Sequence, residues 1–322
     1  MNATSRVSVV SVFHDRAELV QASVQSLIDQ TLGDLEILLV DDGSTDSTLE
    51  RLRGFDDPRV RVITHPNMGF TGAIRAAVAE AAGDYVAIHG SGDLSRPDRL
   101  ERQKAVLDEM PNVGLVGCSH SYKGRKIGPD SFELIEVGGV LERLRVKNPF
   151  IHGEVMFRKS CYDEAGGYDT SFVYGQDSDL WLRMSLLCEF AILPEMLYER
   201  RNPFNSITRN ARKFYDQQKL AQSQLHRAER SGLYKRSDEQ LPLSARIEEI
   251  DKEFARRFYD RGIGALLSRD YEGAGYVLRR TWRERRDVRG AKALMLSLLC
   301  KLPLGGPVAR NAVRAKRRLF PR

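Results

Sequence analysis

Residues 85–103 read YVAIHGSGDLSRPDRLERQ, and they contain the transition on which the fold assignment depends. The apolar run Tyr85–Ile88 predicts a short strand that is buried on both faces. A glycine-rich loop follows and ends at Asp93, and Pro97 stands just before a helical pattern over residues 98–109. A strand, a polar loop and a helix form the repeating unit of a parallel α/β sheet, so this stretch predicts an α/β fold.

The same unit occurs three times before residue 85. Continuous apolar runs predict buried strands at residues 7–13, 35–40 and 60–63. Helical patterns follow them at residues 18–28, 47–53 and 70–82, with Gly83 expected to end the last one. Ligands of such sheets bind beyond the carboxyl ends of the strands. Asp15, Asp41 and Asp93 all lie at such ends, and they are therefore candidate site residues.

The second half of the chain is less regular. It predicts a strand at 113–118, a helix at 132–146, an extended segment at 148–157 and a helix at 178–187. From about residue 211 long charged helices dominate, and residues 256–299 resemble a helical hairpin. We therefore predict two domains, one over residues 1–210 and a helical, basic extension over 211–322.

The composition is that of a globular protein, with 322 residues, 42% hydrophobic and 29% charged. The four cysteines lack C-x-x-C spacing, which argues against a disulfide framework or a zinc site and suits a reducing cytosol. No apolar signal segment precedes the first strand at Val7, and no apolar run reaches the roughly 18–20 residues that span a bilayer. The sequence predicts a cytoplasmic protein.

The net charge of +6 is unevenly distributed. Residues 279–322 carry 14 Lys or Arg and 2 Asp or Glu, whereas the remainder of the chain carries 36 Lys or Arg and 42 Asp or Glu. Because the body has no basic excess, nucleic acid is not an expected partner. An apolar stretch at 293–304 precedes a basic cluster at 314–318. Either this tail lies on the anionic inner face of the cell membrane, or its leucines pack on the preceding helices and its charges are solvated.

Three motifs together carry a family resemblance. Asp41-Asp42-Gly43-Ser44-Thr45-Asp46 follows a predicted strand, and alone it could be an ordinary turn. The second motif is the frame Asp93-x-x-x-Pro97-x-Arg99-Leu100-Glu101. The third combines Gly166-Gly167-Tyr168-Asp169 with Gln176-Asp177-x-Asp179-Leu180-Trp181-x-Arg183. With these motifs, residues 5–208 resemble the family 2 glycosyltransferases.

The resemblance implies a GT-A fold with a mixed central sheet, in which residues 1–110 form a Rossmann-like nucleotide-sugar half and residues 111–210 an acceptor half. It also implies an inverting transfer of a sugar from a nucleotide sugar, most simply a UDP-sugar, to a hydroxyl group. The implied acceptor is a saccharide or a lipid-linked saccharide in polysaccharide or glycolipid assembly. The alternative is a catalytically degenerate module that only binds a sugar nucleotide or a partner.

The resemblance also assigns roles to residues. Asp177 corresponds to the general base, and Asp41 to the acid that recognises the uracil ring. Asp179 is expected to cap a helix or to pair with Arg183, four residues later. The implied donor-binding residues are Val12, His14, Asp15, Asp41, Arg75, Gly90, Gly92 and Asp93. The implied acceptor-binding residues are His152, Gln176 and Trp181, although a lone His is more often a hydrogen-bonded structural residue.

The sequence departs from the family where a metal is expected. Family members usually read Asp-x-Asp-Asp where this chain reads Gly90-Ser91-Gly92-Asp93, and they often carry a His in the segment that corresponds to residues 198–203. Only Asp93 remains as a doubtful ligand for Mn²⁺ or Mg²⁺. We therefore expect weak or absent metal dependence, with arginine donors on the diphosphate instead. The candidates are Arg75, Arg96, Arg200 and Arg201.

Overall fold

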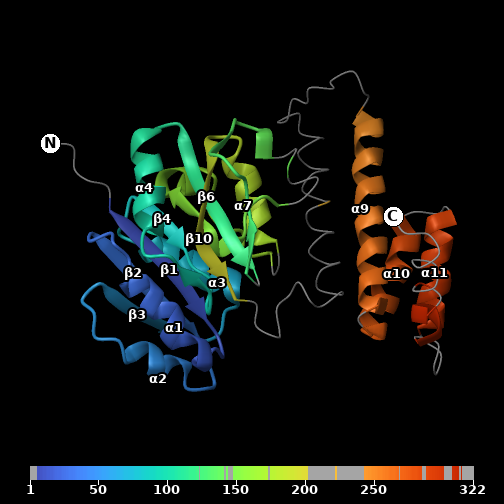
Figure 1. Ribbon diagram of the computed structural model, residues 1–322, viewed down its shortest axis with the longest axis horizontal. Helices are drawn as coiled ribbons and strands as arrows, with labels where there is room; N and C mark the ends of the chain where they lie inside the picture. Colours follow the sequence, from blue (N-terminus) through green and yellow to red (C-terminus); the bar gives the residue numbers. More distant parts are fainter. Residues whose placement is uncertain are drawn as a thin grey trace. The chain divides into compact units, whose positions relative to one another are not determined.

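The computed structural model of the chain divides into two compact units, Met1–Pro203 and Phe204–Arg322 (Figure 1). The residues that it describes are 6–122, 124–140, 143, 148–172, 175–201, 222, 243–267, 269–284, 288–300, 307–311 and 313. The domain boundary predicted after residue 210 lies outside the described residues.

The first unit is built on one mixed sheet with the strand order β3-β2-β1-β4-β9-β6-β10-β5. The strands are β1 (Val7–Phe13), β2 (Leu35–Asp42), β3 (Val60–His65), β4 (Tyr85–Ile88), β5 (Leu94–Ser95), β6 (Val113–Tyr122), β9 (Met156–Arg158) and β10 (Glu189–Arg200). Strands β1 to β4 pair with one another in parallel, and β6 pairs with β10 in parallel. Strand β9 is antiparallel to both β4 and β6, so it joins the N-terminal strands to the later ones.

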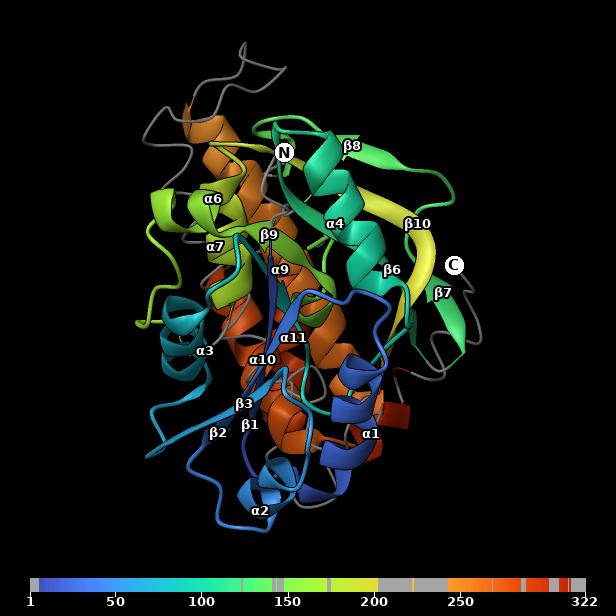
Figure 2. The ribbon, with the colours of Figure 1, turned by 90° about the vertical axis from the view of Figure 1, so that its left-hand side faces the viewer.

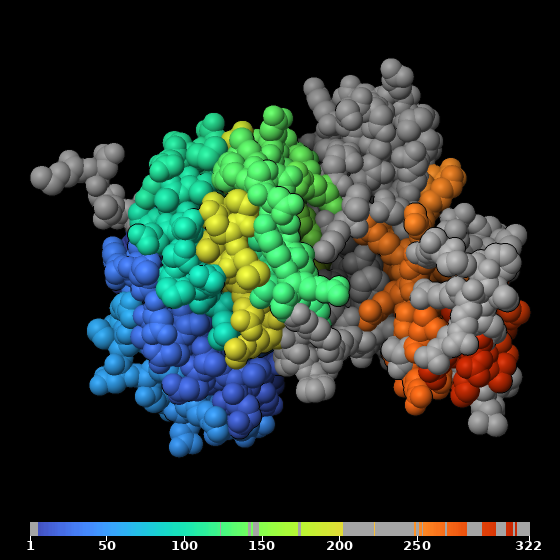
Figure 3. Space-filling model, viewed as in Figure 1, coloured from blue at the N-terminus to red at the C-terminus, as the bar shows by residue number. Residues whose placement is uncertain are grey.

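Two short strands complete this sheet: β7 (Arg125–Ile127) pairs with β6, and β8 (Glu133–Ile135) pairs with β10. Strand β10 also pairs with β5. In Figure 3 the yellow surface of β10 lies between green residues near 130 and blue-green residues near 100, in keeping with these two pairings. Strand β10 therefore brings segments that are far apart in the sequence to one edge of the unit.

Helices cover both faces of the sheet (Figure 2). On one side lie α3 (Phe70–Glu80), α6 (Lys159–Glu164) and α7 (Gln176–Met184), and on the other side lie α1 (Ala17–Ile28) and α4 (Arg99–Glu109). Helix α2 (Thr48–Arg53) packs on α1. Because successive side chains of a strand point to opposite faces, the buried residues form two hydrophobic cores, one on each side of the sheet.

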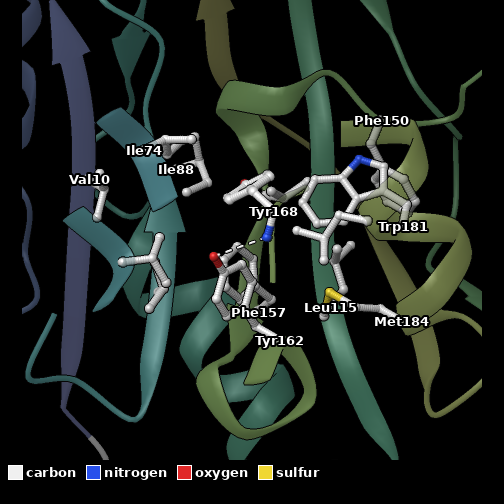
Figure 4. Packing of buried hydrophobic residues seen from close by; sticks show 14 of the residues in the cluster. Val10, Ile74, Ile88, Leu115, Phe150, Phe157, Tyr162, Tyr168, Trp181 and Met184 are labelled. Atoms are coloured by element: carbon white, nitrogen blue, oxygen red, sulfur yellow. Dashed lines mark hydrogen bonds between the residues drawn. The ribbon is translucent and has the colours of Figure 1, made fainter. Parts of the chain in front are cut away.

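The core beneath α3, α6 and α7 is rich in aromatic side chains (Figure 4). The rings of Phe157 and Tyr162 are stacked with centroids 5.4 Å apart, and Trp181 packs beside Phe157. The backbone N–H of Tyr168 donates to the hydroxyl of Tyr162 at 3.2 Å, which satisfies a polar group inside the core. These rings fix α6 and α7 against the sheet.

The structure confirms the strands predicted at 7–13 and 85–88 and lengthens others, but it overturns three local predictions. The segment predicted as extended at 148–157 contains the 3₁₀ helix η1 (His152–Glu154). The helix predicted at 132–146 is wrong at its start, because Glu133–Ile135 is the edge strand β8. Ile135 is buried whereas 41% of Leu134 is exposed, which is the two-residue alternation of a strand. Gly83 does not end α3, since the helix stops at Glu80 and Ala81 is already extended.

The second unit contains α9 (Leu243–Leu267), α10 (Tyr271–Glu284) and α11 (Val288–Leu299), with α10 packed on both neighbours. On α11, Ala293 and Leu296 are buried, whereas more than half of Met295 and of Leu298 is exposed. One face of this apolar helix therefore packs on the preceding helices, which is the alternative to membrane binding that the sequence left open. Among the described residues no helix is long and apolar enough to cross a membrane. The basic cluster at 314–318 lies outside them.

Gly83 offers a test of the close packing between the start of β4 and β1. A Cβ atom on Gly83 would lie 2.6 Å from the backbone nitrogen of Ser8, and backbone cannot yield easily. We expect Gly83→Ala to lower the free energy of unfolding by about 1–3 kcal/mol, the usual cost of overpacking, as measured by urea denaturation. Gly33→Ala is the matched control, because nothing lies within 4 Å of its added carbon. Equal stabilities of the two variants would contradict this packing.

Candidate functional site

The carboxyl ends of β1 and β2 lie side by side, because Phe13 pairs with Asp41 in the parallel register. Only 1% of Asp41 is exposed. Its carboxylate accepts hydrogen bonds from the Thr64 hydroxyl at 3.2 Å and from the Ser44 N–H at 3.4 Å. These contacts hold Asp41 at the strand edge where parallel sheets bind ligands. Its contact with a nucleotide base remains a prediction.

The loops that leave β1 and β2 are bonded to each other. Asp15 adopts a left-handed φ of 49°, and its Oδ1 accepts the Thr45 N–H at 2.7 Å. That bond lowers the pKa of Asp15, so its exposed carboxylate is ionised at neutral pH. His14 Nδ1 donates to the carbonyl oxygen of Asp42 at 2.9 Å, and its ring lies at the surface. The structure thus brings three predicted donor-side residues, His14, Asp15 and Asp41, to one edge.

Asp93 is held inside the protein by two donors. Its Oδ2 accepts the hydroxyl of Tyr198 at 2.7 Å, and its Oδ1 accepts the backbone N–H of Arg201 at 2.8 Å. The same tyrosine oxygen accepts the N–H of Gly90 at 2.9 Å. Burial raises the pKa of Asp93 to about 6, although both donors act in the opposite direction. We call these four residues the Asp93 clasp.

The clasp explains why glycine occupies the positions that lack acids. A Cβ atom on Gly90 would lie 2.5 Å from Asp93 Oδ2. Gly92 has a φ of 96°, which side chains rarely adopt, and its Cβ would lie 2.6 Å from Leu19. A Cβ on Gly153 would lie 2.1 Å from the Tyr198 hydroxyl. The loop is therefore closed around the clasp and has no room for the missing side chains.

This arrangement does not fit a divalent metal ion. A hard divalent cation takes about six oxygen ligands. Both oxygens of Asp93 already accept hydrogen bonds, and Gly90 and Gly92 supply no side chain. Across the described part of the chain, no group of three or more His, Cys, Asp or Glu is placed to hold a metal. Asp93 is therefore a poor fit for a metal ligand in this arrangement.

A buried arginine lies beneath the clasp. Arg99 at the start of α4 is fully buried, and its guanidinium carbon lies 5.0 Å from the centre of the Tyr198 ring. Its N–H groups donate to the Ser95 hydroxyl at 2.8 Å, the Ile88 carbonyl at 2.8 Å and the Gln103 side chain at 3.0 Å. Arg99 thus orders the ends of β4 and β5. Arg99 belongs to the motif that begins at Asp93, but no pattern in the sequence indicates that its side chain is buried.

On the opposite side of the site, Asp177 stands in the first turn of α7. The turn begins at Gly175, which has a φ of 78°. Asn148 Nδ2 donates to Asp177 Oδ2 at 3.2 Å, and Asn148 Oδ1 accepts the N–H of Phe150 at 3.0 Å, which fixes the orientation of the amide. Asp177 is half-buried, so it remains open to a ligand. Asn148 was missed by sequence reasoning, because no motif marks it.

The second aspartate of this motif has a different environment. Asp179 is buried and accepts a hydrogen bond from Arg183 Nη2 at 2.6 Å, which confirms the predicted pair. The same nitrogen of Arg183 also donates to the carbonyl of Gly167 at 2.8 Å. Asp179 and Arg183 therefore anchor α7, whereas Asp177 is directed to the site.

His152 lies beside Asp177 in an aromatic setting. Its Nε2 is 2.6 Å from the Tyr168 hydroxyl, and its ring makes edge contacts with Phe70 and Tyr168 at centroid distances of 5.5 Å. Burial lowers the pKa of His152, whereas the charge of Asp177 acts in the opposite direction. At neutral pH His152 is therefore an uncharged, hydrogen-bonded side chain at the acceptor side.

The remaining predicted residues divide into exposed and buried ones. Arg75 is exposed on α3, and its Nη1 donates to the Tyr168 carbonyl at 2.9 Å. Val12 and Gln176 are buried. Trp181 is fully buried in the aromatic core, where Phe157 and Phe150 lie beside it (Figure 4), and its role at the acceptor stays a prediction. Trp181 supports the site from below.

Comparisons with known proteins show the family of this chain. The model of the family described as Glycosyl transferase family 2 matches residues 8–165. The amylovoran biosynthesis glycosyltransferase AmsE of Erwinia amylovora is 30% identical over 200 residues, covering 60% of this chain and 74% of AmsE. The chain belongs to glycosyl transferase family 2. It is therefore an enzyme that transfers a sugar from a nucleotide sugar.

Two further comparisons define how far the likeness extends. The hyaluronan synthase of Pasteurella multocida is 32% identical over 206 residues, which cover 61% of this chain but only 21% of the synthase. The crystal structure of S. aureus TarS 1-349 in complex with UDP-GlcNAc superposes with a TM-score of 0.62 at 16% identity, covering 98% of this chain and 93% of TarS. At that identity the likeness concerns the fold alone, and it confirms the GT-A class with C-terminal helices.

Asn148 is expected to position Asp177 in this glycosyltransferase. We expect Asn148→Ala to lower kcat about tenfold and to leave donor affinity unchanged, because one hydrogen bond to a charged group is worth about 1.5 kcal/mol. Ser178→Ala is the control, because Ser178 touches Asn148 at 3.1 Å but is not a contact of the Asp177 carboxylate. A wild-type kcat in Asn148→Ala would argue against this role.

Proposed function

We propose that this protein is an inverting glycosyltransferase that moves a sugar from a UDP-sugar to a hydroxyl of a saccharide or lipid-linked saccharide. The observation that carries the proposal is the setting of two aspartates: Asp41 at the carboxyl end of β2 and Asp177 at the start of α7. One is buried at the end of a parallel strand, where nucleotides bind, and the other is half-buried and held by Asn148.

In this proposal Asp177 is the general base. The acceptor hydroxyl donates its proton to the Asp177 carboxylate as its oxygen attacks the anomeric carbon, and the nucleoside diphosphate leaves on the opposite side. A single displacement of this kind inverts the anomeric centre. The hydrogen bond from Asn148 would hold the carboxylate toward the acceptor, and the neutral ring of His152 would line the acceptor side without competing for the proton.

Asp41 would recognise the nucleotide base. A uracil ring presents an N–H donor, and the Asp41 carboxylate is an acceptor buried beside the Thr64 hydroxyl. The choice of uridine is supported by TarS 1-349, which was solved with UDP-GlcNAc, and the setting in polysaccharide assembly by the name of AmsE.

The leaving diphosphate would be neutralised by arginines rather than by a metal ion. Arg75 is the first candidate, because its hydrogen bond to the Tyr168 carbonyl fixes the guanidinium while its exposed face can still donate to phosphate oxygens. Arg200 and Arg201 are the second candidates. Asp93 binds the backbone N–H of Arg201, and this bond places both arginines beside the loop after β4.

The separation of roles can be tested by a pair of variants. We expect Asp177→Asn, which keeps the shape but removes the base, to lower the transfer rate by roughly 10²–10⁴-fold with little change in UDP affinity. Asp41→Ala is the matched variant with the opposite signature, a loss of UDP affinity of about 1–3 kcal/mol by calorimetry. Near-normal turnover of Asp177→Asn would rule out Asp177 as the general base. Unchanged UDP binding by Asp41→Ala would rule out Asp41 as the residue that recognises the uracil ring.

A further inference from the structure

Two cysteines from distant parts of the sequence meet behind the acceptor side. Cys161 lies on α6, and Cys188 lies between α7 and β10. Both point at Gly114 of β6, where an added Cβ atom would lie 2.1 Å from the Cys188 sulfur and 2.9 Å from the Cys161 sulfur. The two sulfurs therefore occupy the space that a side chain at position 114 would fill, although they come from different parts of the fold.

The two thiols differ in access and in acidity. Cys161 is partly exposed, whereas Cys188 is buried and lies 3.3 Å from the Met184 carbonyl. The interaction with the neighbouring Cys188 thiol lowers the pKa of Cys161 to about 7, whereas the interaction with Cys161, together with burial, raises the pKa of Cys188. An accessible thiol that ionises near neutral pH next to a buried one is the arrangement of an attacking and a resolving cysteine.

We propose that Cys161 and Cys188 are a reversible modification site, which closes to an intramolecular disulfide when the protein meets a low-molecular-weight disulfide such as oxidised glutathione. The Cys161 thiolate attacks one sulfur of the oxidised glutathione and releases one reduced glutathione. The Cys188 sulfur then attacks Cys161 and releases the second. Overall, two protein thiols lose their two hydrogens and two electrons to the oxidant, which becomes two molecules of reduced glutathione.

The position of the pair connects it to the acceptor side. The new bond would close a loop from Cys161 to Cys188 that contains the whole of α7, including Asp177. Tyr162, the neighbour of Cys161, accepts the N–H of Tyr168, whose hydroxyl meets His152. The disulfide would therefore restrain the elements that carry the acceptor-side residues.

The test uses the full-length wild-type protein, incubated with oxidised glutathione at neutral pH. Remaining thiols are then alkylated, and non-reduced peptides are mapped by mass spectrometry. We expect a peptide that joins Cys161 to Cys188, with Cys118 and Cys300 alkylated, so that two of the four thiols are lost. Dithiothreitol should restore all four. A stable glutathione adduct on Cys161 with Cys188 still reduced, or an unmodified Cys161, would overturn the proposal.

Variants identify the order of the two steps. Cys188→Ser should trap the glutathione adduct on Cys161, whereas Cys161→Ser should leave Cys188 reduced. Cys300→Ser is the control and should form the same disulfide as the wild type. If the variants fold poorly, the rate of alkylation by iodoacetamide in the wild type still decides the point, because Cys161 should react fastest of the four. A faster reaction at Cys118 or Cys300 would contradict its role as the attacking thiol.

Discussion

The carboxylate of Asp93 is the constraint on which the geometry of the site depends. It joins the loop after β4 to Tyr198 of β10 and to the backbone of Arg201. These elements belong to different halves of the sheet, which β9 connects by pairing with both β4 and β6. Because a buried carboxylate is costly unless it is paired, the bonds to its two oxygens hold the halves in one register. The buried Arg99 beneath Tyr198 completes this support.

The clasp also determines which chemistry remains available. Asp93 alone supplies at most two oxygens, each of which already accepts a hydrogen bond, and a side chain at Gly90 or Gly92 would have to displace Asp93 or Leu19. Asp41 and Asp177 lie outside the clasp, so the groups proposed for donor recognition and for proton transfer are unaffected. In the proposed mechanism these two aspartates keep their roles, whereas Asp93 joins the loop after β4 to β10.

Much of the N-terminal fold could be predicted from the sequence, because each buried strand is a continuous apolar run and each helix has one apolar face. Local patterns failed where distant contacts decide the outcome. Glu133–Ile135 becomes a strand because β10 offers an edge, and Trp181 is buried because α7 faces an aromatic core. The contact between Asn148 and Asp177 and the meeting of Cys161 with Cys188 arise only from the tertiary fold, and no spacing in the sequence indicates them.

The most direct test of the clasp is a calorimetric titration of the wild-type protein with Mn²⁺ in the presence of saturating UDP at pH 8, paired with transfer assays in excess EDTA. At this pH Asp93 is ionised, because the pH lies well above its pKa of about 6, so protonation cannot hide a metal site. We predict no stoichiometric Mn²⁺ binding beyond that of UDP alone and full transfer in EDTA. One equivalent of bound Mn²⁺ that is lost in Asp93→Asn, together with transfer abolished by EDTA and restored by Mn²⁺, would contradict the account.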